Sequence, residues 1–257
     1  MSIGVSVVVP AYQEGDAILP VLDRILASVE SELEVLVVVD FADDTTVAPV
    51  EAHPEHGERL RLVVSSYGRG PANAIRYGVD QASQGIVAVT MADGSDDPRQ
   101  IDALARLVDR GVVVAVASRY APGGQQVGGP LLKSMMSRGA GVSLGVLARV
   151  GTRDATNSFK AYNRDFVRAV GIHSRSGFEM GIELTAKARR LRLPVAEIST
   201  IWLDRTVGDS NFQLKAWIPL YLRWYRFAFG PKLSLEQVVA EAERIAAINN
   251  ATRSSHD

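Results

Sequence analysis

Residues 86–109, IVAVTMADGSDDPRQIDALARLVD, contain a short apolar run, an acidic turn and a helical stretch, and this unit decides the fold. The run at 86–91 is mostly apolar and β-branched, which is typical of a strand buried on both faces. Pro98 suits the first turn of a helix. Apolar residues then recur on one helical face through residue 108. The stretch therefore predicts a strand, a turn and a helix in that order.

The same alternation extends over the first 118 residues. Further buried strands are predicted at 5–9, 33–39, 60–64 and 112–117, with helices at 17–29 and 72–82. Apolar strands separated by helices predict an α/β fold with a mostly parallel sheet covered on both faces. In such sheets ligands bind beyond the carboxyl ends of the strands.

The second half of the chain is less regular. We predict a glycine-rich loop at 121–135, helices at 135–150 and 179–192, a strand at 195–203 and a helix at 234–249. A polar tail at 250–257 is predicted to be disordered. The simplest organisation is one domain over residues 1–213 with a C-terminal helical extension over residues 214–257.

Composition excludes several classes of protein. The chain has 257 residues, a net charge of −1 and no cysteine, so we expect no nucleic-acid partner, no disulfide and no thiolate metal site. No glycine triplet follows the first strand and no G-x-x-x-x-G-K-[ST] run exists, which argues against an NAD-dependent oxidoreductase and a P-loop NTPase. No signal peptide and no bilayer-spanning run of ~18–20 apolar residues is recognised, so we expect a cytoplasmic protein.

The acidic turn after the strand at 86–91 contains Asp93, Ser95, Asp96 and Asp97. Hard cations such as Mg²⁺ and Mn²⁺ take oxygen ligands, and a metal here could bridge the two phosphates of a nucleotide diphosphate. The alternative is helix capping ahead of Pro98 by Asp96 or Asp97. The two interpretations are compatible, with Asp93 on the metal and Asp97 on the cap.

Two arginines are candidate phosphate ligands. Arg119 directly follows a predicted strand, and Arg205 lies in the loop 204–211, DRTVGDSN. A guanidinium suits phosphate because its donor fork matches the anion. The alternatives are a surface salt bridge for Arg119 and a plain turn around Arg205.

The stretch 215–230, KAWIPLYLRWYRFAFG, is aromatic and basic. Trp217, Tyr221, Trp224 and Ala228 recur at helical spacing. This composition is typical of a helix that lies in a membrane interface, with Trp217 and Trp224 at the lipid surface. An ordinary helix packed on the core is the alternative.

Taken together, the motifs resemble those of family 2 glycosyltransferases of the GT-A fold, most closely the dolichol-phosphate (polyprenyl-phosphate) mannosyltransferases. The match spans roughly residues 4–215, and its strength lies in the shared order of the motifs. The matching segments are VVVPAYQE at 7–14, Asp40, Ser118-Arg119-Tyr120, Pro122-Gly123-Gly124, Lys133, Ser137-Arg138, Asp154, Ser158-Phe159, Ser176-Gly177-Phe178, Glu183, Arg205, Gly208 and Ser210.

The resemblance implies a GT-A domain over 1–213 and inverting transfer of a hexose from a nucleotide sugar to a polyprenyl phosphate at the cytoplasmic membrane face. GDP-mannose is the first donor expected and a UDP-sugar the second. Asp93 and Ser95 would hold Mg²⁺ or Mn²⁺, and Asp93, Arg119 and Arg205 would be catalytic. Residues implied in nucleotide binding are Pro10, Ala11, Tyr12, Glu14, Asp40, Arg69 and Ala92. Residues implied in binding the donor or acceptor phosphates are Arg119, Lys133, Arg205 and Ser210.

Three positions depart from the family pattern. Met91 replaces the first aspartate of the D-x-D motif, Phe41 replaces a second aspartate after Asp40, and Asn211 replaces a lysine. These changes leave two alternatives: a transferase of the same fold that acts on a glycan or soluble acceptor, and a non-catalytic protein that binds nucleotide sugars.

Overall fold

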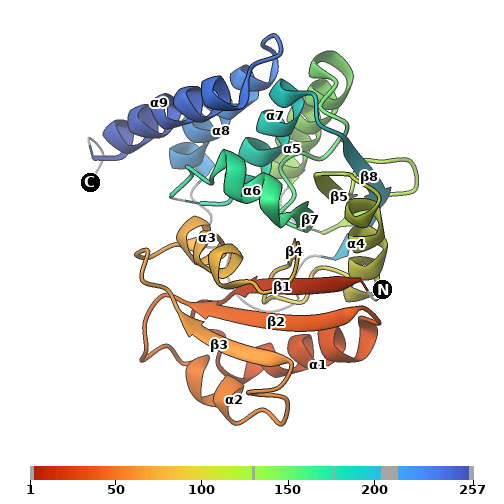
Figure 1. The fold of residues 1–257 in the computed structure, drawn as a ribbon, viewed down its shortest axis with the longest axis vertical. Coiled ribbons are helices and arrows are strands. Elements are labelled where there is room, and N and C mark those ends of the chain that lie inside the picture. The colour runs from red at the N-terminus through yellow and green to blue at the C-terminus, as the bar shows by residue number, and fades with distance from the viewer. Residues whose placement is uncertain (1–2, 129–130, 176, 204–213, 255–257) are drawn as a thin grey trace.

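The computed structural model describes residues 3–128, 131–175, 177–203 and 214–254. Its centre is a seven-stranded sheet with the strand order β3-β2-β1-β4-β7-β5-β8 (Figure 1). The strands are β1 Gly4–Pro10, β2 Glu32–Val39, β3 Leu60–Val64, β4 Ile86–Val89, β5 Val114–Ser118, β7 Lys160–Asn163 and β8 Val195–Ser199.

The sheet is mostly parallel, which confirms the predicted fold class. β1 pairs in parallel with β2 and β4, β2 with β3, and β5 with β8. β7 is the exception, because it runs antiparallel between β4 and β5. It was not predicted, since its four residues, KAYN, are too few to show a period and begin with the charged Lys160.

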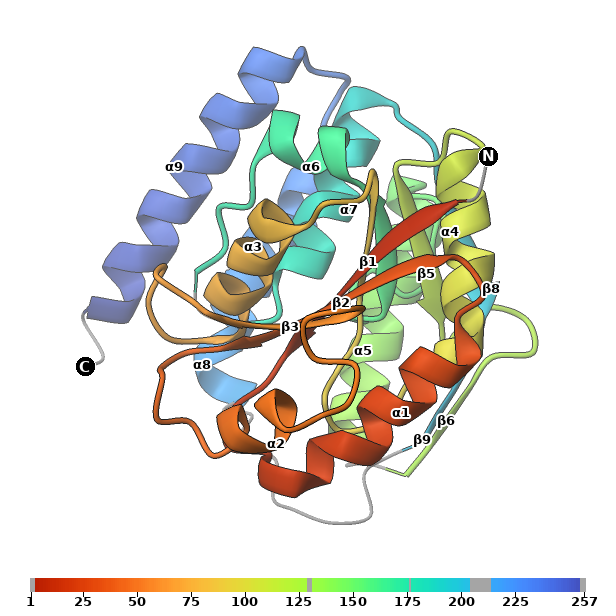
Figure 2. The ribbon, with the colours of Figure 1, turned by 60° about the horizontal axis from the view of Figure 1, so that its bottom comes forward.

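Helices cover both faces of the sheet (Figure 2). One face packs against α1 Leu19–Ser28 and α4 Ile101–Asp109, and its apolar core includes Leu22, Ile25 and Leu104. The other face packs against α3 Pro71–Gln81, α6 Arg164–Val170 and α7 Met180–Leu191, with Ile75 and Leu184 in a second core. Short elements at the sheet margins are η1 Gly15–Ile18, α2 Val47–Glu51 and η2 Pro98–Gln100.

The C-terminal helices, α8 Leu214–Ala228 and α9 Leu235–Ser254, pack on the domain. A third apolar core joins them to α7 and to the π-helical turn η3 Leu144–Ala148. Trp224 is fully buried in this core, so the prediction that it lies at a lipid surface is wrong. The alternative, a helix packed on the core, holds for this residue because the apolar face of α8 is already covered. The side chain of Trp217 lies outside the described residues.

Other differences lie in the second half of the chain. α9 continues to Ser254, so the predicted disorder of 250–257 is wrong for 250–254. The predicted strand at 195–203 is two strands, β8 and β9 Ile201–Leu203, because β9 leaves the main sheet to pair with β6 Gln125–Val127. β6 and the start of α5 Leu131–Ser143 occupy part of the predicted loop at 121–135. Among the described residues, no helix combines the length and apolar character needed to span a bilayer.

Candidate functional site

The polar segments predicted to converge do lie at one edge of the sheet. β1, β2, β4 and β5 run in the same direction, so their carboxyl ends lie at the same edge of the sheet. Ala11 after β1, Asp40 after β2, the acidic loop after β4 and Arg119 after β5 therefore share this edge. Such an edge is where α/β sheets bind ligands.

The turn after β1 is held by a buried carboxylate that sequence reasoning missed. Asp44 accepts hydrogen bonds from the backbone N–H of Gln13 at 3.0 and 3.1 Å and of Thr46 at 2.8 Å. The hydroxyl of Thr46 in turn accepts from the N–H of Glu14 at 3.0 Å. These bonds fix the turn that carries Tyr12 and Glu14, with Gln13 in a left-handed conformation at φ 55°. The Asp-Thr-Thr run at 44–46 is a turn signal that could have identified them.

Next to this turn, Tyr12, Asp40, Phe41 and Arg69 form a group that is called the cradle below, with Asp40 at its base. Its carboxylate accepts from the N–H of Gly70 at 2.9 Å, and Gly70 needs its φ of 109° to present that N–H. Burial raises the pKa of Asp40, although the Gly70 bond and Arg69 oppose the shift. The guanidinium of Arg69 lies 5.2 Å from the ring centroid of Phe41.

Tyr12 completes this group, because its ring meets Phe41 edge-on at 6.0 Å and half of its surface is exposed. The predicted nucleotide residues Tyr12, Asp40 and Arg69 are thus gathered around Phe41. Pro10 ends β1, and the N–H of Ala11 donates to the carbonyl oxygen of Val38 at 2.9 Å. Ala92 is buried in the loop after β4.

Hydrogen bonds within the acidic loop assign different positions to its carboxylates. Asp93 accepts from the N–H and the hydroxyl of Ser95 at 3.1 and 2.6 Å. Asp97 accepts from the N–H of Arg99 at 3.1 Å and caps η2, which confirms the predicted cap. The loop is held against α1, where Arg24 donates to the carbonyl oxygen of Gly94 at 3.4 Å.

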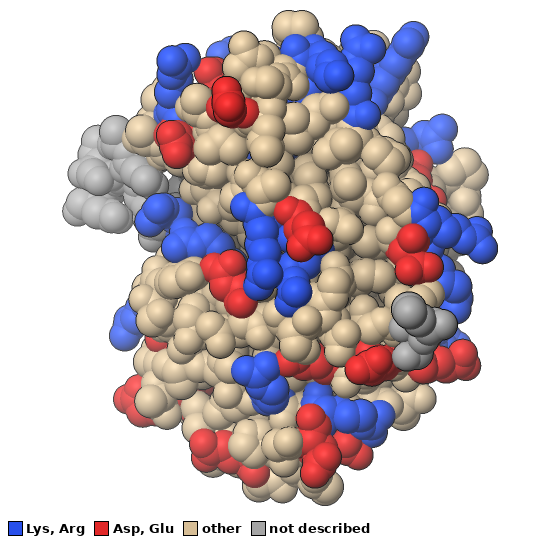
Figure 3. All heavy atoms as spheres, viewed as in Figure 1, with Lys and Arg blue, Asp and Glu red and all other residues tan. Residues whose placement is uncertain are grey.

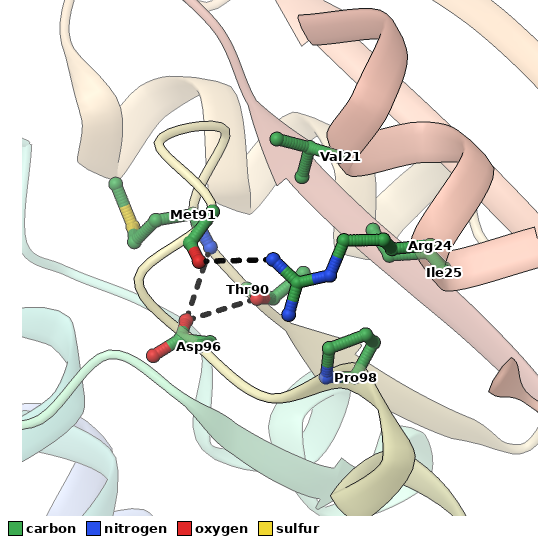
Figure 4. A pocket seen from close by; sticks show the side chains of 8 residues that line it. Val21, Arg24, Ile25, Thr90, Met91, Asp96 and Pro98 are labelled. Carbon is green, nitrogen blue, oxygen red and sulfur yellow. Dashed lines mark hydrogen bonds between the residues drawn. The ribbon is translucent and has the colours of Figure 1, made fainter. Parts of the chain in front are cut away.

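Asp96 points into the loop rather than toward solvent. It accepts from the hydroxyl of Thr90 at 2.9 Å and from the N–H of Met91 at 3.3 Å (Figure 4). Burial raises the pKa of Asp96 to about 6, and the nearby charge of Asp93 adds to the shift. Asp96 therefore fixes the loop from inside.

Asp93 and Ser95 supply a carboxylate and a hydroxyl 2.6 Å apart, and such oxygen donors suit a hard divalent cation. Within the described ranges, no cluster of three or more Asp, Glu, His or Cys side chains could hold a metal. The residues therefore fit a cation that takes its remaining ligands from water and from a bound diphosphate, as Mg²⁺ commonly does.

Arg119 forms a buried ion pair with Asp154. Its Nε donates to Oδ2 and its Nη2 to Oδ1, both at 2.8 Å, and its backbone N–H donates to Oδ2 at 3.0 Å. The side chains are 12% and 0% exposed, so the predicted alternative of a surface salt bridge is wrong about its location. Asp154 matches the family pattern, but the sequence does not predict its bond to Arg119, because the two residues are 35 positions apart.

Residues of α5 and Lys160 of β7 lie close to this ion pair. α5 places the hydroxyl of Ser137 3.4 Å from Nη2 of Arg119 and 2.9 Å from the hydroxyl of Thr156. Gly141 permits this close approach, since a Cβ there would collide with the carbonyl oxygen of Arg153. Lys160, which sequence reasoning missed, donates to the carbonyl oxygens of Ala155 and Asn157.

Lys160 is fully buried behind Arg119 and Asp154. Burial lowers its pKa to about 7, although the charge of Asp154 opposes the shift. Arg205 and Ser210 lie outside the described residues, as does the side chain of Lys133, so their implied roles remain predictions.

A family model described as glycosyl transferase family 2 matches residues 6–171. The chain belongs to this family. It is therefore a glycosyltransferase, which argues against the non-catalytic alternative.

An undecaprenyl-phosphate mannosyltransferase of Micrococcus luteus is 25% identical over 210 residues, which cover 79% of this chain and 85% of that protein. A polyprenol monophosphomannose synthase of Mycolicibacterium smegmatis is 26% identical over 216 residues, covering 80% of this chain and 79% of that protein. The glucosyl-3-phosphoglycerate synthase of Mycobacterium tuberculosis, solved with Mn²⁺, uridine diphosphate and glucosyl-3-phosphoglycerate, superposes with a TM-score of 0.64. That structure is 17% identical and covers 90% of this chain and 81% of its own, so it supports the fold alone.

Proposed function

We propose that this family 2 glycosyltransferase moves a hexose, mannose by resemblance, from a nucleotide-diphosphate sugar to a polyprenyl phosphate at the cytoplasmic face of a membrane, with inversion. The observation that carries the proposal is the similarity over about four fifths of the chain to two proteins named as polyprenyl-phosphate mannose enzymes. The arrangement of charged groups at the carboxyl edge of the sheet supports it.

The donor would lie across the cradle and the acidic loop. Asp40, Tyr12 and Arg69 would bind the nucleoside, with GDP-mannose as the first donor and a UDP-sugar as the second. Asp93 and Ser95 would hold Mg²⁺ or Mn²⁺ against the diphosphate. Such a cation offsets negative charge as the diphosphate leaves.

The acceptor phosphate would lie beside Arg119. An oxygen of that phosphate attacks the anomeric carbon, a new carbon–oxygen bond forms, and the bond to the donor's diphosphate breaks with its electron pair on the departing nucleotide. The attacking oxygen is already anionic near neutral pH, so a strong general base is not needed. Asp154 engages Nε and Nη2 of Arg119, so among the described residues Nη1 is the nitrogen that would bind the acceptor.

Transfer to a soluble acceptor is the second candidate. The burial of Trp224 favours it, because a tryptophan with no exposed surface cannot contact lipid. Both candidates share the same donor chemistry and differ in the acceptor alone.

The test supplies purified protein and Mn²⁺ with radiolabelled GDP-mannose or UDP-glucose, and either polyprenyl phosphate in vesicles or a small phosphorylated acceptor. We expect label in the organic phase with polyprenyl phosphate, and its loss in Asp93→Asn. Asp109→Asn is the matched control, because Asp109 is an exposed aspartate at the end of α4. Label that appears only in the soluble product would refute the lipid acceptor and establish the second candidate.

A further inference from the structure

A hollow of about 240 Å³ lies between α3 and α6, on the face of the sheet that these two helices cover. Its walls include three apolar side chains, Val79, Val167 and Ile172, and three charged ones, Arg76, Asp80 and Arg168. The volume is well above that of one water molecule, about 30 Å³, and below the range of roughly 300–1,000 Å³ usual for drug-sized ligands. The hollow therefore suits a small polar molecule.

Arginines dominate the charge of this hollow. Arg76 stacks over the ring of Tyr67 at 4.3 Å, and burial together with the charge of Arg175 lowers its pKa. Within the part of the chain that the structure describes, the guanidinium groups of Arg76, Arg168 and Arg175 form no hydrogen bond or salt bridge. Figure 3 shows Lys and Arg side chains gathered in the middle of this face, over the region of α3 and α6 in Figure 1.

The carboxylate of the hollow accepts a hydrogen bond from a neighbouring tyrosine. Asp80 is the only carboxylate among the described residues that line it, and its Oδ2 accepts from the hydroxyl of Tyr67 at 2.8 Å. Asp80 lies one helical turn after Arg76, and its charge opposes the lowering of the pKa of Arg76 by burial, without a salt bridge between the two described side chains. Two guanidinium groups and one carboxylate line the hollow, and the guanidinium of Arg175 lies near enough to add to the lowering of the pKa of Arg76 by burial, so these four side chains together carry a net charge of +2. A phosphate monoester carries about −1.5 to −2 near neutral pH and would balance it.

We propose that this hollow is a second anion site, which binds a small phosphorylated ligand apart from the donor cradle. Guanidinium forks bind phosphate oxygens bidentately, and the apolar wall would accept the non-phosphate part of the ligand. The site also adjoins the donor cradle structurally. α3 starts at Pro71, next to the Gly70 whose N–H binds Asp40, and it carries Arg76 one and a half turns later.

The test titrates inorganic diphosphate into metal-free protein by calorimetry, and separately a nucleoside diphosphate in the presence of Mn²⁺. We expect Arg168→Gln and Arg76→Gln each to weaken the binding of inorganic diphosphate at least tenfold, which is about 1.4 kcal/mol. Both variants should keep their nucleotide affinity within about twofold. Arg168 is exposed, so its replacement leaves the core intact. Arg168→Lys keeps the charge without the fork and should give an intermediate loss.

Arg110→Gln is the matched control, because it removes one positive charge from an exposed position at the end of α4. It should leave both titrations unchanged. The proposal would be overturned by wild-type protein that does not bind diphosphate, by Arg76→Gln and Arg168→Gln variants that bind it as wild type does, or by an equal loss in Arg110→Gln. A parallel loss of nucleotide affinity would also overturn it, because the anion would then occupy the donor cradle. None of these outcomes depends on which acceptor the enzyme uses.

Discussion

Replacing Asp154 by alanine would leave the guanidinium of Arg119 buried without its partner. The pair is joined by two side-chain hydrogen bonds of 2.8 Å, and Asp154 itself has no exposed surface. Removing one member of a buried ion pair costs about 3–5 kcal/mol, because the remaining charge stays desolvated. A free-energy change of 1 kcal/mol lowers the melting temperature by about 2–4 °C in a domain of this size, so we expect a decrease of roughly 6–20 °C.

The assay is urea unfolding of wild type, Asp154→Ala, Arg119→Ala and the double variant at pH 7.5. The double variant should cost little more than either single one, so the interaction energy should approach the cost of one single variant, about 3–5 kcal/mol. Arg244→Ala is the control, since Arg244 and Glu241 form an exposed pair on α9 and its loss should cost about 0.5 kcal/mol or less. If Asp154→Ala loses less than about 1 kcal/mol, or if the single effects simply add, the pair does not act as a buried unit.

Three further predictions concern the acidic loop and α7. Asp93→Asn should abolish any increase in nucleotide affinity that Mn²⁺ gives in calorimetry, and an unchanged Mn²⁺ effect would remove Asp93 from the metal site. Asp97→Ala should lower stability in urea by about 1 kcal/mol through loss of the cap, yet keep the Mn²⁺ effect; a lost Mn²⁺ effect would contradict the separation of the two carboxylates. Burial alone would raise the pKa of Glu183, but Lys187 and the donors of residues 173–174 lower it to about 2. This folded-state pKa is below the ordinary 4.5, so the stability it contributes is present above pH 4.5 and is lost as the pH falls toward 2. Glu183→Gln should therefore be less stable than wild type at pH 7 and show a flatter decline between pH 4.5 and 2 in urea unfolding, and parallel pH profiles would argue against this assignment.

Most of the sheet could be predicted because its strands are buried on both faces. β1 and β2 are mostly apolar and buried, and that pattern is a local property of the chain, whereas β3 carries Arg61 and is only partly buried. β7 carries no such pattern. Its Lys160 is buried because the loop carbonyl oxygens at 155 and 157 bind its ammonium, and this compensation is visible only in three dimensions.

The candidate site divides in the same way. Residues that directly follow strands, such as Asp40 and Arg119, could be placed at the sheet edge from strand order alone. The buried carboxylates that hold these segments, Asp44 and Asp154, depend on partners 31 and 35 residues away in the chain. In α8, aromatic residues at helical spacing predict an apolar face, but the sequence does not predict what packs against that face. Here the cover is α7, η3 and α9 rather than lipid.

The carboxyl edge of the sheet carries several charges that are costly to bury. Burial moves the pKa values of both Asp96 and Lys160 toward neutrality, and Arg119 is stabilised by its ion pair with Asp154 and by the charge of Asp96. Replacing buried ion pairs by apolar side chains is often neutral or stabilising, so the structural bonds of these groups do not by themselves explain why the edge carries so many charges. A bound diphosphate would bring negative charge to the cationic groups of this edge, and its cation would bring positive charge to the carboxylates. We therefore expect the donor to stabilise the protein by more than its contacts with the exposed Tyr12 and Arg69 would account for, since it also neutralises groups that are already desolvated.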